Sequence, residues 1–420
     1  MIERYQDSVM SQIWSRQSEL ERWHRVEVEW MREVIGDGPA KLLSDVGAPE
    51  VGQAAAAELS TKHDVVAFLR ALDLRVQEAG INDPQDNIPD YHVVRQWLHY
   101  GLTSSDVADT GLGMAMKRAT VRLNELANQT LEGLESLFDN PQPPVMARTH
   151  GQHAIRMDAR HRWGVLYGML SRAIARCSGA ESGIAIGKLS GPVGEGVTLP
   201  GPEVPGYVPE HRALRRLGLN TVGSTQLVPR DSLVFWAQCW ANAATVCEAV
   251  ATQVWLLTQQ DVGEIVERPG PDQVGSSAMP HKSNPIRSEN IRGLARLARI
   301  QAQVLQDSMV QWGEHDLSHS SVERVALPDL CHLVAAILSR TSALLGSIEF
   351  RQRTVEYPDS HAELMRLQRE GVPYVEAHQQ LRATYQRGTI SADRPKTACG
   401  NPDQYCGQLG GSARCGGCKE

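Results

Sequence analysis

Apolar residues recur at helical spacing through the middle of the chain. Leu233, Trp236, Trp240, Ala244 and Cys247 follow one another at intervals of three or four, and neither Gly nor Pro occurs between 230 and 262. Such intervals place apolar side chains on one helix face, so the pattern predicts a long helix. Comparable patterns predict further helices at 114–138, 159–177, 294–310 and 330–345. Because runs of alternating apolar and β-branched residues are nearly absent, the sequence predicts an all-α fold.

Breaks in this pattern divide the chain into three expected helical domains. The first, 1–102, is more charged and contains the polar breaks GDGPA and INDPQDNIPD. The second, 103–350, holds the long helices, joined by connectors such as LSGPVGEGVTLPGPEVPG, and is predicted to be a bundle. The third, 351–420, is a shortened helical domain that ends in a cysteine-containing tail. The apolar faces of the bundle exceed what one chain can cover, which predicts an oligomer.

Charge and polarity narrow the classes of partner. With 42 Lys and Arg against 49 Asp and Glu, the formal charge of −7 gives no general attraction to nucleic acid or acidic membranes. An anionic substrate therefore needs a local basic site. The segment 232–260 carries only one charged residue, but its other polar side chains would be costly in lipid, which favours a buried helix. The N-terminus lacks the basic and apolar runs of a secretory signal, which predicts a cytoplasmic protein.

The cysteines fall into two groups. The first group lies in apolar helical contexts that are typical of reduced core thiols: Cys177, Cys239, Cys247 and Cys331. The second group lies in the C-terminal tail and contains one CxxC, a spacing that is also a weak zinc signal: Cys399, Cys406, Cys415 and Cys418.

Three polar stretches interrupt the helices and concentrate reactive side chains. The first, HYGLTSSDVADT, offers hydroxyl and N–H groups at a predicted helix start, which suits either anion binding or an ordinary N-cap. The second, ARTHGQH, places His150 and His153 beside Arg148, a spacing that fits acid–base chemistry, metal ligation or a solvated turn. A zinc site would need a third ligand and usually an HExxH arrangement, which the sequence lacks, so no metal is predicted.

The third stretch, GSSAMPHKSNPIRSEN, carries the most informative mixture. A Gly- and Ser-containing loop is followed at short range by His281, Lys282, Asn284 and Glu289. Few structural roles need these side chains together, although a solvated connector also collects polar residues. Chemistry alone leaves both interpretations open.

The three stretches together resemble the three separated blocks shared by the fumarase and aspartase superfamily of lyases. Within that superfamily, GSSAMPHKSNPIRSEN is most similar to the adenylosuccinate lyases. Further agreement comes from MIERY at the N-terminus, KHDVVAF at 62–68, STQ at 224–226 and DLSHSS at 316–321. The resemblance extends from residue 1 to about 385, and matches in this order over most of a chain are far more specific than one motif.

The resemblance implies an activity and an assembly. Members of the family remove fumarate by β-elimination from adenylosuccinate to give AMP, usually also from the succinylated aminoimidazole carboxamide ribotide of purine synthesis, and use no cofactor. Their fold is three mainly helical domains. The central bundles of four subunits combine, and each active site is built from three subunits. We therefore expect a homotetramer that binds a succinylated purine nucleotide and neither nucleic acid nor membrane.

The resemblance also implies roles for individual residues. Ser276 would abstract the proton, Lys282 would stabilise the developing negative charge, His150 would protonate the departing nitrogen, and Glu289 would orient His150. Other matching positions hold the nucleotide or the succinyl carboxylates, with Arg324 and Lys282 as the main anion partners. These predicted binding residues are Arg4, Tyr5, His63, Asp64, His99, Thr103, Ser104, Gln226, Ser277, Asn284, Ser320, Ser321 and Arg324.

Three departures from the family pattern leave alternatives open. Ser283 and His315 stand where the family usually has Arg, and Ile155 and Arg156 replace a usual Glu-Pro pair. The alternatives are a lyase for a modified succinylated purine such as a 2-amino analogue, a sibling lyase acting on argininosuccinate or a carboxymuconate, and a catalytically silent homologue. The MPHK and KHDVVAF segments favour the purine branch, and retention of all four predicted catalytic residues argues against the silent homologue.

Overall fold

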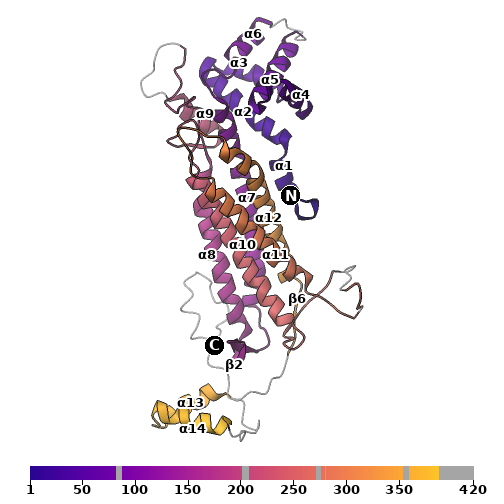
Figure 1. The fold of residues 1–420 in the computed structure, drawn as a ribbon, viewed down its shortest axis with the longest axis vertical. Coiled ribbons are helices and arrows are strands. Elements are labelled where there is room, and N and C mark those ends of the chain that lie inside the picture. Colours follow the sequence, from indigo (N-terminus) through magenta and orange to yellow (C-terminus); the bar gives the residue numbers. More distant parts are fainter. Residues whose placement is uncertain (82–87, 201–207, 271–275, 280, 353–358, 387–420) are drawn as a thin grey trace, which may run out of the picture.

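Five long helices form an elongated bundle at the centre of the computed structural model (Figure 1). The structure describes residues 1–81, 88–200, 208–270, 276–279, 281–352 and 359–386. The bundle helices are α7 (Ser104–Asp139), α8 (Ala159–Ile184), α10 (Asp231–Thr258), α11 (Ile286–Asp307) and α12 (Ser318–Leu345). Their apolar faces meet in one buried cluster that includes Trp163, Trp236 and Trp240. The expectation of an all-α fold is confirmed.

Three bundle helices begin well before the positions that periodicity predicts, and one of them, α11, begins at Ile286 rather than at 294. Helix α7 begins at Ser104 rather than at 114, because the N–H of Thr103 donates to the Asp106 carboxylate and caps its first turn. Helix α12 begins at Ser318 rather than at 330 and continues through Pro328. Proline removes one hydrogen bond from a helix. The helix continues there because Leu327 and Leu330, which flank Pro328, are buried and pack against the bundle.

Shorter helices surround the end of the bundle where α7 begins (Figure 1). A second buried cluster, which contains Trp23, Trp30 and Phe68, joins these helices to Val107 and Met114 of α7. The predicted domain limits at 102/103 and 350/351 stay predictions. The elements at this end are α2 (Arg16–Ile35), α3 (Asp37–Val46), α4 (Val51–Thr61), α5 (Asp64–Ile81), α6 (Ile88–Trp97) and α9 (Pro209–Leu217). A short 3-10 turn at Glu3–Tyr5 and α1 (Ser8–Ile13) instead pack against the bundle itself.

The strands of the described chain are short and occur in pairs. Each pair joins connectors rather than forming a layer of the fold. The pairs are β1 (Val145–Thr149) with β2 (Gln152–Met157), antiparallel; β3 (Ile186–Gly187) with β4 (Asn220–Thr221), parallel; and β5 (Ile265–Glu267) with β6 (Ile348–Phe350), antiparallel.

The last described elements are α13 (Ser360–Arg369) and α14 (Tyr374–Gln386), which pack on each other. The four cysteines of the tail lie outside the described residues. Cys177, Cys239, Cys247 and Cys331 are buried and form no disulfide, as predicted for core thiols. None of the helices that the structure describes combines the length and apolar character needed to cross a membrane.

Candidate functional site

The first polar stretch forms the turn before α7 and its first helical residues. Asp106 is fully buried and accepts a hydrogen bond from the N–H of Thr103 at 2.7 Å. Gln226, from a segment far along the chain, donates through Nε2 to Thr103 Oγ1 at 3.5 Å. Ser104 follows as the first residue of α7 and is half-buried. The structure therefore brings together three of the predicted binding residues, Thr103, Ser104 and Gln226.

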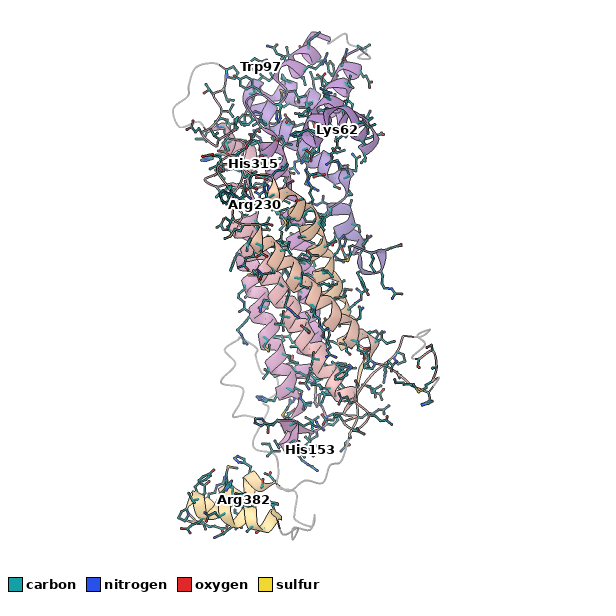
Figure 2. All side chains as sticks on the ribbon, in the orientation of Figure 1. Lys62, Trp97, His153, Arg230, His315 and Arg382 are labelled. Carbon is teal, nitrogen blue, oxygen red and sulfur yellow. The ribbon has the colours of Figure 1, made fainter. Side chains whose placement is uncertain are left out.

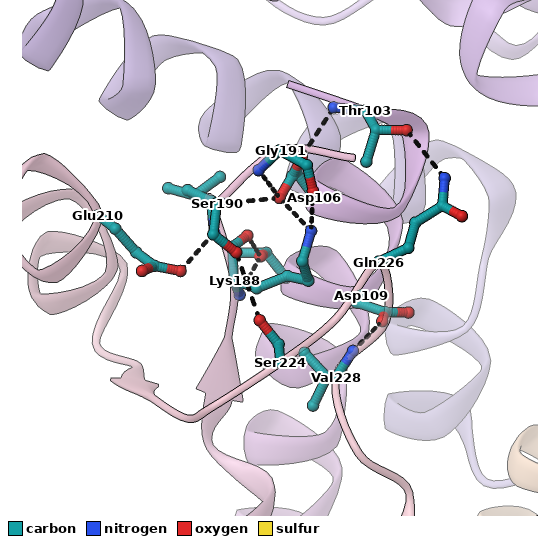
Figure 3. Close-up of polar contacts among 12 residues, drawn as sticks. Thr103, Asp106, Asp109, Lys188, Ser190, Gly191, Glu210, Ser224, Gln226 and Val228 are labelled. Atoms are coloured by element: carbon teal, nitrogen blue, oxygen red, sulfur yellow. Dashed lines mark hydrogen bonds and ion pairs between the residues drawn. The ribbon is translucent and has the colours of Figure 1, made fainter. Parts of the chain in front are cut away.

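A fourth segment, 188–197, closes around Asp106, and sequence reasoning treats it only as a connector. Lys188 Nζ lies 2.5 Å from Asp106 Oδ1, and the N–H groups of Ser190 and Gly191 donate to the same oxygen (Figure 3). The one available signal in the sequence is a lysine between an apolar run and a Gly-rich loop. That signal does not identify the partner of the lysine, because Asp106 lies 82 residues away.

A buried network at the start of α10 holds the same end of the bundle together. Arg230 donates to Asp109 of α7 at 2.8 Å and to Glu323 of α12 at 2.7 Å. Burial alone would lower the pKa of Arg230, but the carboxylates of Asp109 and Glu323 raise it above its ordinary value. Arg230 therefore stays charged and fixes the start of α12, which carries Ser320, Ser321 and Arg324.

Asp64 and Arg324, two predicted binding residues that are 260 positions apart, form an ion pair. The neighbouring His63 is exposed, and its Nδ1 accepts from the N–H of Val66 at 3.4 Å. The start of α5 therefore lies against the first turns of α12. The KHDVVAF segment and residues 318–324 therefore meet within one chain.

His99 lies in the turn that leads to α7 and pairs with a buried carboxylate. Its Nδ1 is 2.6 Å from Glu27 Oε1, and its backbone N–H donates to Glu27 Oε2 at 3.1 Å. Burial lowers the pKa of His99, but the Glu27 carboxylate outweighs this effect and raises the pKa above its ordinary value. His99 is therefore fixed in position and biased toward its charged form.

A cavity of about 640 Å³ lies beside Arg230, between the segment 223–231 and the residues that follow α11. Arg230, Thr225, Gln311 and Glu314 are among its lining residues. The side-chain amide of Gln311 and Nδ1 of His315 are buried and have no hydrogen-bond partner within the part of the chain that the structure describes. Volumes of this size hold small-molecule ligands in other proteins.

Arg4 and Tyr5 lie against the side of the bundle. The Tyr5 hydroxyl accepts from Asn290 Nδ2 at 3.3 Å, and the guanidinium of Arg340 lies 5.2 Å from the centre of the Tyr5 ring. Arg340 also donates to the carbonyl of Arg4 at 2.9 Å. The N-terminus is thus held near the first turns of α11.

The second polar stretch forms the hairpin of β1 and β2, with His150 in its turn. His150 is exposed and adopts a φ of +54°, followed by Gly151 at +77°. Arg148 donates to Glu264 at 2.6 Å and fixes the base of the hairpin. Figure 2 shows His153 of this hairpin at the opposite end of the bundle from Arg230 and His315.

The third polar stretch leads into α11 and includes its first five residues, and most of its described residues are exposed. Ser276 Oγ accepts from the N–H of Met279 at 3.1 Å, and Ser277 and Lys282 face solvent. Glu289 accepts from Trp255 Nε1 at 3.2 Å. The carbonyl of Asn284 accepts from the N–H of Ile286 at the start of the helix. No hydrogen bond or ion pair between described residues joins His150 to Ser276 or Glu289.

The predicted site residues therefore divide between two ends of one bundle. Helix α7 alone has 36 residues and, at 1.5 Å per residue, separates Thr103 from the hairpin of His150 by about 54 Å. A nucleotide is far shorter than this separation. A single chain does not assemble all the predicted residues into one site.

Comparison with known proteins defines the class. A family model described as lyase matches residues 50–300. An adenylosuccinate lyase of Staphylococcus saprophyticus subsp. saprophyticus is 36% identical over 343 residues, covering 79% of this chain and 73% of that enzyme. The chain belongs to this lyase family, within the fumarase and aspartase superfamily. Within the superfamily, the resemblance to the adenylosuccinate lyases is confirmed.

Two solved structures share the architecture of this chain. A fumarate lyase from Mesorhizobium sp. BNC1 superposes with a TM-score of 0.76 at 20% identity, covering 92% of this chain and 88% of that chain. A 3-carboxy-cis,cis-muconate lactonizing enzyme from Pseudomonas putida gives 0.77 at 21% identity, with 92% and 86% coverage. At these identities the likeness concerns the fold alone.

Proposed function

We propose that this lyase removes fumarate from adenylosuccinate and leaves AMP, and that it acts in the same way on the succinylated aminoimidazole carboxamide ribotide. The observation that carries the proposal is the 36% identity to an adenylosuccinate lyase over most of the chain. A silent homologue has less support, because His150, Ser276, Lys282 and Glu289 are all present. A modified succinylated purine as substrate has less support because the relative that matches most of the chain is an adenylosuccinate lyase. We also infer a cytoplasmic location.

The first step of the proposed reaction removes a proton from the succinyl carbon next to a carboxylate. The conjugate base at that carbon carries its charge into the carboxylate, so nearby positive charge lowers the barrier. We assign Ser276 as the base and Lys282 as the cation that favours its alkoxide and the growing negative charge. The exposure of Lys282 in the single chain leaves its ammonium available to the substrate.

The second step breaks the carbon–nitrogen bond. The electron pair at the succinyl carbon forms the double bond of fumarate, and the bond electrons leave with the purine nitrogen. We assign His150 as the acid that protonates this nitrogen, and Glu289 as the carboxylate that orients and charges the imidazole. Two proton transfers and one bond cleavage balance the reaction, so side chains suffice and no cofactor enters it.

We assign nucleotide and carboxylate binding to the predicted residues at both ends of the bundle. Thr103, Ser104 and Gln226 offer hydroxyl and amide groups side by side, and Arg324 offers a guanidinium that Asp64 holds in place. The adjacent cavity with its unpartnered Gln311 amide supports a polar ligand here.

We further propose a homotetramer in which each site takes residues from three subunits. The separation of about 54 Å along α7 supports this, because only another copy can bring His150 to Thr103. The outer face of α11 supports it as well: Leu297, Ile300 and Val304 recur at helical spacing and are exposed. A face of this kind is typical of a helix that packs against another subunit.

The direct test is the ultraviolet absorbance change when adenylosuccinate is added to the purified protein, with Ser276→Ala beside it. We expect wild-type turnover and a loss of at least roughly 1000-fold in the variant, because the proton then has no base. Wild-type turnover that persists in Ser276→Ala would reject the assigned base. Absence of wild-type turnover would instead favour a modified substrate or a silent homologue.

Mixing two inactive variants tests whether the sites are shared. If His150 and Ser276 of one site come from different subunits, random reassembly of His150→Gln with Ser276→Ala restores about one quarter of the sites, one half times one half. Each variant alone, taken through the same dissociation and reassembly, is the control. A mixture no more active than the two controls would contradict sharing.

A further inference from the structure

Lys188 and Asp106, hereafter the buried pair, form an ion pair that protein encloses completely. Both side chains are 0% exposed, and Nζ lies 2.5 Å from Oδ1. Removing two charges from water is costly, and their attraction offsets the cost only when further hydrogen bonds satisfy both groups. Lys188 Nζ also donates to the carbonyl of Gly191 at 3.1 Å. Such a pair adds little net stability, so its main contribution is to hold the neighbouring segments in a fixed geometry.

The carboxylate of the buried pair links two separate segments (Figure 3). Oδ1 accepts from the N–H of Ser190 at 3.0 Å and of Gly191 at 3.3 Å, and Oδ2 accepts from the N–H of Thr103 at 2.7 Å. Burial raises the pKa of the Asp106 carboxyl, and Lys188 together with these N–H donors opposes that rise. Without the ammonium, the carboxylate would lose its counter-charge while remaining in the interior.

The same loop reaches the segment that carries Gln226. Ser190 Oγ lies 3.3 Å from Ser224 Oγ. Gly194 has a φ of +82°, and a Cβ at that position would lie 2.1 Å from the carbonyl oxygen of Ser224, so only glycine permits this approach. Gln226, two residues beyond Ser224, donates back to Thr103 Oγ1. The contacts therefore close a ring that starts and ends at Thr103.

The lysine is fixed in this arrangement from its backbone as well. Thr110 Oγ1 donates to the Lys188 carbonyl at 2.8 Å and accepts from the Lys188 N–H at 3.1 Å. Thr110 is itself fully buried on α7. Since neither charged group of the buried pair reaches the surface, neither can contact a substrate.

We propose that the buried pair is a positioning element of the lyase. It sets the distance from Gln226 to the adjacent residues Thr103 and Ser104, and thereby the affinity for the nucleotide. The inference rests on the proposed function, because that function makes these residues contact the substrate. The buried pair acts through the backbone N–H of Thr103 and through the loop that contacts Ser224. It takes no part in the proton transfers.

The test compares Lys188→Met, Asp106→Asn and the double variant with wild type, in the full-length protein. We expect KM for adenylosuccinate to rise at least about tenfold in each single variant while kcat changes by less than about threefold, since binding geometry is lost and the reacting groups are not. The double variant should be no worse than the worse single variant, because the two residues act as a unit. It also removes both charges and so remains folded if a lone buried charge prevents folding.

Leu43→Ala is the matched control, because Leu43 is fully buried in the apolar cluster that contains Val107 and Leu189, the chain neighbours of the buried pair, and it lies outside the site. It should lower the melting temperature and leave KM unchanged. Variants of the buried pair that lose only thermal stability, with wild-type KM, would overturn the inference. AMP binding measured by calorimetry separates this inference from the proposed function. If the wild type binds AMP without turning over adenylosuccinate, the affinities of the variants for AMP still test the inference. If the wild type neither binds AMP nor turns over adenylosuccinate, both proposals are overturned.

Discussion

The two ends of the bundle are built in opposite ways. At the end where α7 begins, Asp106, Lys188 and Arg230 are buried, and each is held by several hydrogen bonds. At the opposite end, His150 projects from the turn of an exposed hairpin, and Lys282 likewise faces solvent. One end of a single chain therefore holds several of the proposed binding groups in fixed positions. The other end presents the groups proposed to react outward, where another subunit can complete the site.

Disrupting the proposed subunit contact should have the largest effect, because it separates the two ends that are proposed to form one site. Ile300, which is 57% exposed on α11, lies between Leu297 and Val304 on the outward face. We expect Ile300→Asp to dissociate the tetramer and to reduce turnover at least about 100-fold, because a carboxylate without a partner is costly to bury in an apolar contact. Light scattering after size-exclusion chromatography gives the mass, and the absorbance assay gives the turnover.

Ile300→Leu is the control for this change, since it keeps the apolar volume and should keep both mass and activity. The fold of the isolated subunit should survive Ile300→Asp, because the side chain is exposed in the single chain. Circular dichroism checks this. An Ile300→Asp protein that keeps the wild-type mass would show that the outer face of α11 is not the contact.

Loosening the hairpin of His150 should have a smaller effect. Glu264 is buried and accepts from Arg148 at 2.6 Å and from Arg162 at 3.3 Å. We expect Glu264→Gln to lower kcat about tenfold and to change KM less, because the proposed acid is then less well oriented while the opposite end is intact. Stopped-flow and steady-state absorbance assays provide both constants.

Glu248→Gln is matched to this change, because Glu248 also pairs with an arginine, Arg299, but within the bundle. It should leave kcat unchanged. Equal losses of kcat in the two variants would mean that Glu264 acts only through general stability.

The long helices are predictable from sequence because the spacing of their apolar residues reflects the helix face that packs in the bundle. The 230–262 pattern corresponds to α10, and the all-α class follows from it. Periodicity does not predict the starts of α7 and α12, since Asp106 and Ser320 lie in polar stretches. For α7, the N-cap pattern in HYGLTSSDVADT indicates the helix start instead. Tertiary packing and a capping carboxylate decide those boundaries.

The candidate site is predictable in its motifs and not in its connections. Thr103, Gln226 and Arg324 are recognisable from short sequence motifs. The carboxylate partners of Lys188 and Arg230, by contrast, lie 82 and 121 positions away in the chain. No local pattern encodes which distant carboxylate a buried cation will meet. The residues alone likewise name His150 and Ser276 without showing how far they lie from Thr103 within one chain, and only the family resemblance implies a site shared between subunits.

The smallest expected effect concerns the pair of His99 and Glu27 at the preorganised end. The pKa of His99 is raised in the folded state, so the pair contributes its full stability below the unfolded pKa of about 6.5. That contribution is lost as the pH rises through the higher folded pKa. We therefore expect Glu27→Gln to destabilise the protein more at pH 6 than at pH 9, by on the order of 1–2 kcal/mol.

Thermal unfolding at the two pH values measures this difference, and His99→Asn should show the same dependence because it removes the other partner. A stability deficit of Glu27→Gln that is equal at pH 6 and pH 9 would mean that the charge on His99 contributes nothing.

If the deficit does depend on pH, KM for adenylosuccinate should rise as the pH rises from 6 to 9, since the turn that contains His99 leads directly into Thr103. Turnover limited by His150 at the opposite end would follow its own pH profile, so the two ends can be separated in one series of measurements.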